Sequence, residues 1–84
     1  MKLYEKVTRD NWIKGSVGNG DKHCLVGHIW DMRPLVNVRP LYDAIKMLYP
    51  ERVGGIGGRT IAAFNDHPDT TFEDVQRVLK FADV

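Results

Sequence analysis

Cys24 is the side chain in this 84-residue sequence best suited to nucleophilic chemistry, because histidines lie on both sides of it. His23 precedes it and His28 follows about one helical turn later, and an imidazole near a helix start can activate a thiol. The polar residues 65–67 would complete a Cys, His and Asn or Asp set if their loop folded back. Single cysteines on apolar helices are more often core residues, and no thiol-enzyme motif flanks this one. We therefore expect a buried, unreactive thiol and no catalytic residue, with a small thiol enzyme using Cys24 and His28 as the alternative.

Cys24 and His28 are also four residues apart, as two metal ligands on one helical face would be. A structural zinc site needs four ligands and usually several thiolates, and the chain contains a single cysteine. The sequence therefore predicts no bound metal, and it contains no motif for another cofactor.

A glycine-rich stretch, residues 54–58, leads into a basic and a hydroxyl side chain. Glycine amides at the start of a helix could bind an anion or a nucleotide phosphate. A Walker loop would need Lys in place of Arg and a strand before the glycines. A turn between helices is the simpler interpretation, and the anion site is kept as an alternative. Its candidate residues are Gly57, Gly58, Arg59 and Thr60.

Aromatic and arginine side chains flank Pro34, in a connection that should lie at the surface. Such side chains provide much of the affinity in the centre of protein interfaces. The binding residues expected on this basis are Trp30, Arg33, Arg39 and Tyr42.

The N-terminal half should position these side chains on short elements. Residues 3–12 suit a short helix better than an edge strand. Residues 15–21 are rich in turn formers and predict a loop, whose Asn19-Gly20 tip would alternatively close a hairpin. Residues 23–31 predict a rather buried helix, and Pro34 interrupts the chain after it.

The C-terminal half has the clearest helical periodicity. Residues 37–48 carry apolar side chains at i, i+3, i+4 and i+7, namely Leu41, Ala44, Ile45 and Leu48. Residues 60–64 predict a short helix and residues 65–69 a loop. A capping box, Thr70 with Glu73, predicts the start of the last helix. Its buried stripe should be Phe72, Val75, Val78, Leu79 and Ala82. These two stripes should cover one another.

Size and composition limit the architecture and the partners. Eighty-four residues cannot form two cores, so we expect one domain over residues 1–84, mostly α, a compact bundle of three or four short helices. A small N-terminal β-hairpin is the alternative. Twelve Lys and Arg against eleven Asp and Glu give a charge of +1, without the basic excess of nucleic-acid binders. A single cysteine favours a reducing compartment, and no apolar run suits a signal peptide or a membrane span. We expect a cytoplasmic protein.

Three short motifs resemble those of an uncharacterised family of small phage and actinobacterial proteins. They are Trp12 with Gly15, Cys24 with Gly27, and Phe64-Asn65-Asp66 before a Thr-capped helix. That family shares Trp-x-x-Gly, Cys-x-x-Gly-Ala and Trp-or-Phe-Asn-Asp, whereas this chain has His28 where the family tends to have Ala. The resemblance covers roughly residues 10–82. It implies a phage or mobile-element origin and a bacterial host, and it transfers no catalytic residue.

Small size, near-neutral charge and the absence of a convergent catalytic set favour binding over turnover. The function predicted from the sequence is a non-enzymatic interaction protein that binds a host protein or protein complex stoichiometrically. One such role would be inhibition of a bacterial defence system, such as a CRISPR effector. The alternatives are the thiol enzyme, the anion-binding domain and a structural protein of the virion.

Overall fold

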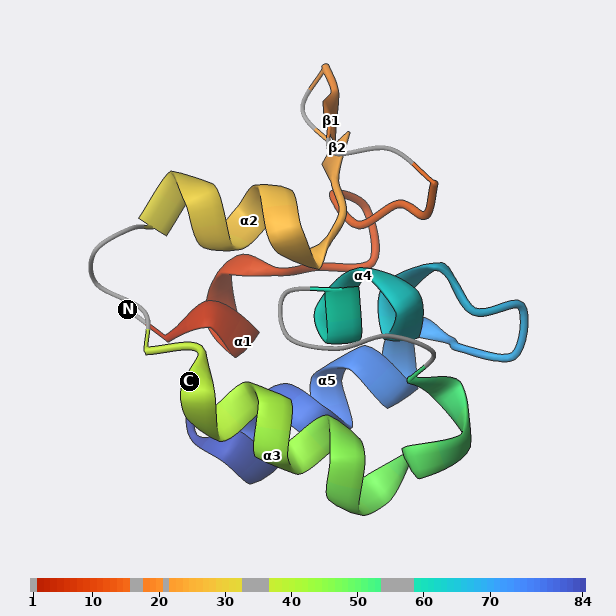
Figure 1. The fold of residues 1–84 in the computed structure, drawn as a ribbon. Helices are drawn as coiled ribbons and strands as arrows, with labels where there is room; N and C mark the ends of the chain where they lie inside the picture. Colours follow the sequence, from red (N-terminus) through yellow and green to blue (C-terminus); the bar gives the residue numbers. More distant parts are fainter. Residues whose placement is uncertain (1, 16–17, 21, 33–36, 54–58) are drawn as a thin grey trace.

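The computed structural model describes residues 2–15, 18–20, 22–32, 37–53 and 59–84. The fold is mostly α, as predicted (Figure 1). The elements in chain order are α1 (Leu3–Lys6), β1 (Gly18–Asn19), β2 (Lys22–His23), α2 (Leu25–Met32), α3 (Arg39–Leu48), the 3₁₀ helix η1 (Pro50–Arg52), α4 (Arg59–Asp66) and α5 (Phe72–Ala82).

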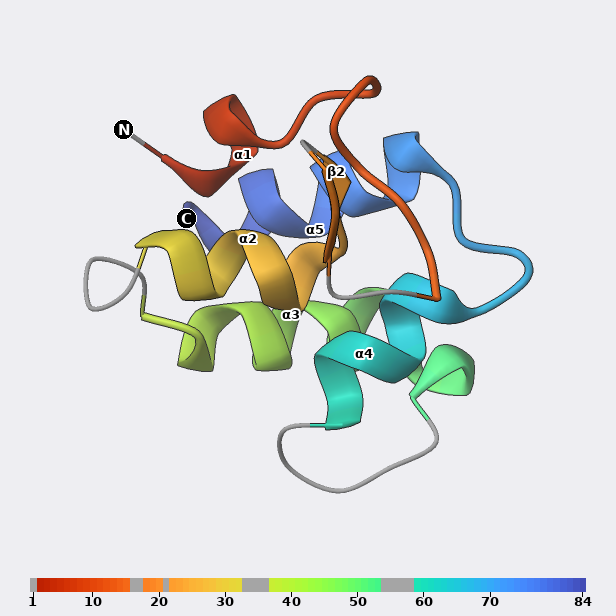
Figure 2. The same ribbon diagram turned by 90° about the horizontal axis from the view of Figure 1, so that it is seen from above.

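The helices pack around one shared interior. α3 lies along α5 and also contacts α4, while α2 packs against α4 and α1. α1 contacts α5 as well as α2 (Figure 2). The chain ends lie close together, since Leu3 N donates to the carbonyl of Val84 and Lys2 Nζ donates to the carbonyl of Asp83 at 3.0 Å.

The predicted apolar stripes of α3 and α5 are confirmed. The side chains that lie fully inside are Leu41, Ala44 and Ile45 on α3 and Val75, Val78 and Leu79 on α5. Leu48, Phe72 and Ala82 are partly buried against the same core. The core is completed by Leu3 and Val7 at the N-terminus, Leu25 and Ile29 on α2, Tyr49 after α3, and Ile61 and Phe64 on α4. One cluster of apolar side chains therefore joins the described helices.

The N-terminal elements are shorter than predicted. α1 covers Leu3–Lys6 and does not reach residue 12, and α2 begins at Leu25, because His23 belongs to β2. β1 and β2 pair antiparallel through Gly18 with His23 and Asn19 with Lys22. Two paired residues on each side form no layer of the fold, so the described chain contains helices and no wider sheet.

α4 is longer than predicted. It extends to Asp66, so Asn65 and Asp66 lie in its last turn and not in a loop. Asn and Asp usually favour loops because their side chains compete for nearby backbone groups. Here both side chains bond mainly to segments distant in sequence, and this competition is removed.

The predicted cap of α5 was wrong by one residue. The N-cap is Thr71, whose hydroxyl accepts a hydrogen bond from Asp74 N at 3.2 Å, while the Asp74 carboxylate accepts from Thr71 N at 3.1 Å. Thr70 and Thr71 are each followed three residues later by an acid, so local sequence allows both registers. Arg52 selects between them, because its guanidinium holds the Asp74 carboxylate at 2.7 Å.

Thr71→Ala should therefore lower the free energy of unfolding by about 0.5 to 2 kcal/mol, the usual loss when an N-cap hydroxyl is removed. Thr71→Ser keeps the hydroxyl and should be close to wild type. Urea unfolding followed by far-ultraviolet circular dichroism measures both. An unchanged Thr71→Ala variant would contradict this assignment of the cap.

Candidate functional site

Asn65 is the most highly connected polar side chain in the interior, where it is fully buried. Its Oδ1 accepts hydrogen bonds from Trp12 Nε1 at 2.6 Å and Leu25 N at 3.1 Å. Its Nδ2 donates to the carbonyl of Ile13 at 3.1 Å and to Asp66 Oδ1 at 2.9 Å. An amide group has two acceptor positions and two donor hydrogens, so Asn65 uses all four. One side chain thus ties α4 to the start of α2 and to residues 12–13.

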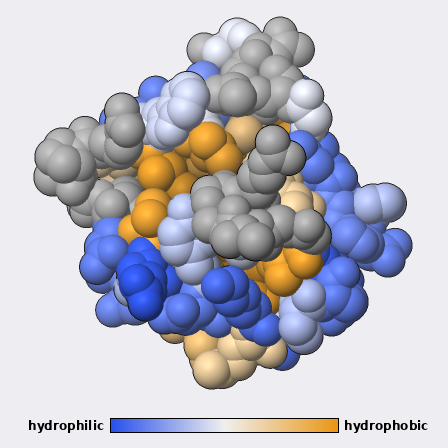
Figure 3. Space-filling model, in the orientation of Figure 1, coloured by the Kyte–Doolittle hydropathy of each residue, from blue (hydrophilic) through white to orange (hydrophobic). Residues whose placement is uncertain are grey.

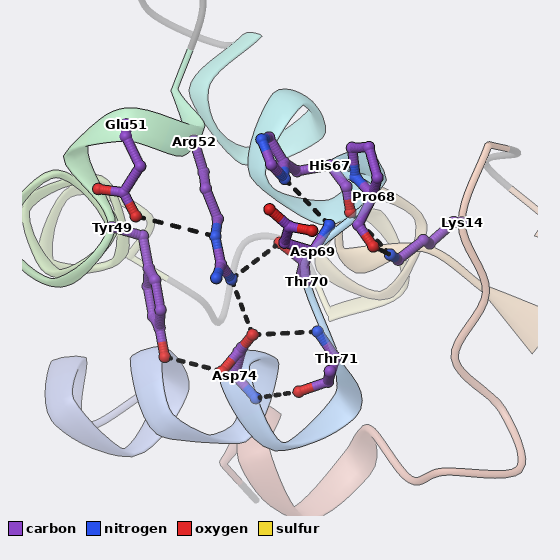
Figure 4. A network of polar contacts seen from close by, with 10 residues as sticks. All are labelled: Lys14, Tyr49, Glu51, Arg52, His67, Pro68, Asp69, Thr70, Thr71 and Asp74. Carbon is purple, nitrogen blue, oxygen red and sulfur yellow. Dashed lines mark hydrogen bonds and ion pairs between the residues drawn. The ribbon is translucent and has the colours of Figure 1, made fainter.

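Asp66 extends this contact to the next turn of the chain. Its Oδ1 also accepts from Gly15 N at 2.8 Å. Gly15 has φ of +76°, a conformation that residues with a Cβ rarely adopt. Lys14 beside it donates to the carbonyl of His67 at 2.7 Å, at the carboxyl end of α4 (Figure 4). The Trp-x-x-Gly and Phe-Asn-Asp motifs therefore meet in space and brace each other.

His28 is a second buried polar group, only 1% exposed. Its Nδ1 lies 2.8 Å from Lys6 Nζ and its Nε2 lies 3.0 Å from the carbonyl oxygen of Asn11. An ammonium group can only donate and a carbonyl can only accept, so the neutral imidazole carries its proton on Nε2. Burial lowers the pKa of His28, the nearby charges of Lys6 and His23 lower it further, and the bond to Asn11 and the charge of Asp31 act in the opposite direction. His28 is thus held neutral.

Cys24 is buried, as predicted, at 6% exposure. Within the described residues its thiol forms no hydrogen bond with a histidine. The ring of His23 instead meets the His28 ring edge-on at a centroid distance of 5.4 Å, and its Nε2 lies 3.7 Å from Asp31. Asn65 is turned toward Trp12 and does not complete a catalytic set.

No group of three or more His, Cys, Asp or Glu side chains in the described part of the chain is arranged to hold a metal ion.

The candidate anion site lies only partly within the described residues. Gly57 and Gly58 lie outside the described residues, while Arg59 and Thr60 open α4. The Thr60 side chain is fully buried, and its hydroxyl has no hydrogen-bond partner among the described residues. It does not face solvent, where an incoming phosphate would meet it.

The candidate binding residues differ in exposure. The Trp30 side chain is 57% exposed near the end of α2 and Arg39 is exposed at the start of α3, whereas Tyr42 is partly buried against the core. Arg33 lies outside the described residues. Figure 1 places the end of α2 and the start of α3 on the same side of the molecule. Figure 3 shows the front of the molecule in the same orientation, where apolar atoms gather near the middle with hydrophilic atoms below them.

A polar cluster that the sequence did not indicate joins η1 to α5 (Figure 4). Asp74 accepts from Arg52 at 2.7 Å and from the Tyr49 hydroxyl at 2.9 Å, and the guanidinium lies 4.5 Å from the centre of the Tyr49 ring. Burial alone would raise the pKa of Asp74, but the hydrogen bonds from Arg52, Thr71 N and Tyr49 outweigh it and lower the pKa. Burial and the bond to Asp74 raise the pKa of Tyr49. A local signal that could have indicated part of this cluster is the position of Asp74, three residues after Thr71.

The geometry describes a small helical domain in which the buried side chains of His28 and Asn65 are committed to internal hydrogen bonds. The chain belongs to a family of unknown function, DUF6197, whose model matches residues 4–83. No curated protein and no solved structure matches it. No helix in the described residues is long and apolar enough to cross a membrane.

Asn65→Ala should lower the free energy of unfolding by about 1 to 3 kcal/mol, because the Trp12 indole N–H, the Leu25 amide and the Ile13 carbonyl lose their hydrogen-bond partner. Trp12→Phe removes one donor and keeps most of the ring, so about 0.5 to 1.5 kcal/mol is expected. The control is Lys46→Ala, since Lys46 is exposed on α3. Urea unfolding of the three variants tests the order, and equal losses for Asn65→Ala and the control would contradict it.

Because the pKa of Asp74 is lowered in the folded state, its contribution to stability is present above the unfolded value of about 3.9 and is lost as pH falls through the folded value. Asp74→Asn should cost about 1 to 3 kcal/mol at pH 7 and flatten the acid side of the stability curve. Thermal unfolding from pH 7 to pH 2 measures this. Asp43→Asn, at an exposed position of α3, should keep the wild-type profile.

Proposed function

We propose that this protein is a non-enzymatic binding module whose contact surface includes the end of α2 and the start of α3. The observation that carries the proposal is the 57% exposure of Trp30, a residue type that often anchors protein interfaces. The other tryptophan, Trp12, is partly buried and hydrogen-bonded to Asn65. Trp30 is therefore the indole free to contact a partner.

The surroundings of Trp30 support a protein partner. Arg39 at the start of α3 is exposed and can add planar, charged hydrogen bonds at the edge of such a contact. The net charge of +1 lacks the basic excess that phosphate neutralisation requires, which argues against nucleic acid. Cys24, His28 and Asn65 are buried, so these three candidates for a catalytic set are withdrawn from solvent.

The proposed partner is a protein or protein complex of a bacterial host, bound stoichiometrically. This rests on the resemblance to small phage and actinobacterial proteins. Inhibition of a defence complex, such as a CRISPR effector, is a role that fits a small binder without turnover. A structural role in a virion would use the same surface against another phage protein.

The experiment begins by identifying, with mass spectrometry, proteins that copurify with the tagged chain, and then measures the affinity of the purified pair. Replacing both Trp30 and Arg39 by Ala should weaken binding at least tenfold, about 1.4 kcal/mol, while the thermal midpoint stays unchanged. Met47→Ala is the matched control, because Met47 is 67% exposed near the far end of α3.

Cys24→Ser separates binding from thiol chemistry. This variant should bind as wild type does. The opposite result would be a folded Cys24→Ser protein without biological activity, together with full activity in the Trp30 and Arg39 double variant. That result would reject the binding module in favour of the thiol enzyme.

A further inference from the structure

The contact between α1 and α2 contains a buried histidine bonded on both sides. His28 on α2 accepts from Lys6 on α1 and donates to the carbonyl of Asn11, which closes the turn after α1. The same carbonyl accepts from His23 N at 2.8 Å, and Asn11 Nδ2 donates back to the carbonyl of Lys6 at 2.9 Å. The two ring nitrogens of His28 thus hold residues 6–11 against α2, Nδ1 through Lys6 and Nε2 through Asn11.

Protonation affects these two points in opposite ways. An imidazolium carries hydrogen on both nitrogens, so it keeps the bond to the Asn11 carbonyl but can no longer accept from Lys6. It would also place a second positive charge 2.8 Å from the ammonium, in a site that is almost closed to water. The Lys6 contact is therefore incompatible with a charged His28.

The Lys6 ammonium has an alternative partner in the Asp31 carboxylate. The Lys6 side chain is 25% exposed, and its Nζ already lies 3.5 Å from Asp31 Oδ2, on a carboxylate that is 51% exposed. The charged groups acting on His28 are Lys6 from α1, His23 from β2 and Asp31 from α2 itself. On α4, which also packs on α2, the Asp66 carboxylate is engaged by Gly15 N.

We propose that Lys6, His28 and Asp31 form an acid-sensitive latch between α1 and α2. At neutral pH the latch is closed by the bond from Lys6 to His28. In acid the imidazolium releases Lys6 toward Asp31 and solvent, and the short helix α1 opens locally. The bonds from Gln76 Nε2 to the carbonyls of Tyr4 and Val7 remain, so the segment loosens without leaving the domain.

The direction follows from proton linkage. Burial lowers the pKa of His28 in the closed state, whereas the open state approaches the usual value of about 6.5. Opening is therefore suppressed above that value and grows as pH falls below it, by at most about tenfold for each pH unit. It levels off once pH passes the closed-state pKa.

Amide hydrogen exchange measured by NMR tests the latch, after correction for the intrinsic pH dependence of exchange. The probe is Val7 N, which donates to the carbonyl of Leu3 and closes α1 at 2.9 Å. Its protection should fall between pH 7.5 and pH 5, while the amide of Leu79 in the core of α5 keeps its own. A parallel NMR titration of the His28 ring should have its midpoint below the usual imidazole value of about 6.5.

Variants distinguish the latch from a merely buried histidine. Lys6→Met removes the ammonium and should reduce the loss of Val7 protection in acid, because burial is then the main remaining cause that lowers the pKa of His28. Asp31→Asn, at an exposed position, should move the transition to lower pH, and it serves if Lys6→Met does not fold. His67→Gln, in the loop after α4, should change nothing. Val7 protection that stays constant in the wild type, or a drop that is as large in Lys6→Met as in the wild type, would overturn the proposal.

Discussion

The buried amide of Asn65 is the contact on which the N-terminal half of this domain depends. A backbone segment without regular structure, residues 12–15, must lie against α2 and α4 although its own peptide groups cannot be paired in a helix. Asn65 and Asp66 bond to the Ile13 carbonyl, the Gly15 amide and the Trp12 indole, and Asn65 also binds Leu25 N at the start of α2. Aspartate could not donate and leucine could not bond, so an amide is needed at this position.

Polar side chains perform the same task elsewhere in the fold. His28 fastens the turn after α1 to α2, and Asp74 joins η1 to the first turn of α5 through Arg52 and Tyr49. A chain of 84 residues has a small core, so hydrogen bonds between distant segments hold the irregular connections that apolar contacts alone would leave loose. Each of these groups would be costly if left unpaired, and this makes the arrangement specific.

This use of polar groups bears on function. Imidazole, thiol and carboxamide are present at suggestive spacings, yet His28 and Asn65 are occupied by structural bonds and Cys24 lies in the interior. Trp30 and Arg39 are exposed, and these residue types are better suited to protein recognition than to catalysis. The two proposals therefore concern different sides of α2. The proposed binding surface faces solvent at Trp30, and the proposed acid-sensitive contact faces α1 at His28.

The amino-acid sequence alone determined the helical class and the buried stripes of α3 and α5, because periodicity and burial are local properties of amphipathic helices. The resemblance to a family of small proteins marked Trp12, Gly15, Asn65 and Asp66 as motif residues, without indicating that they meet. Tertiary structure decided the rest. Whether Thr70 or Thr71 caps α5 depends on Arg52, and whether Asn65 ends a helix or lies in a loop depends on Trp12, 53 positions away. Such choices rest on partners distant in sequence, and one-dimensional spacing does not contain that information.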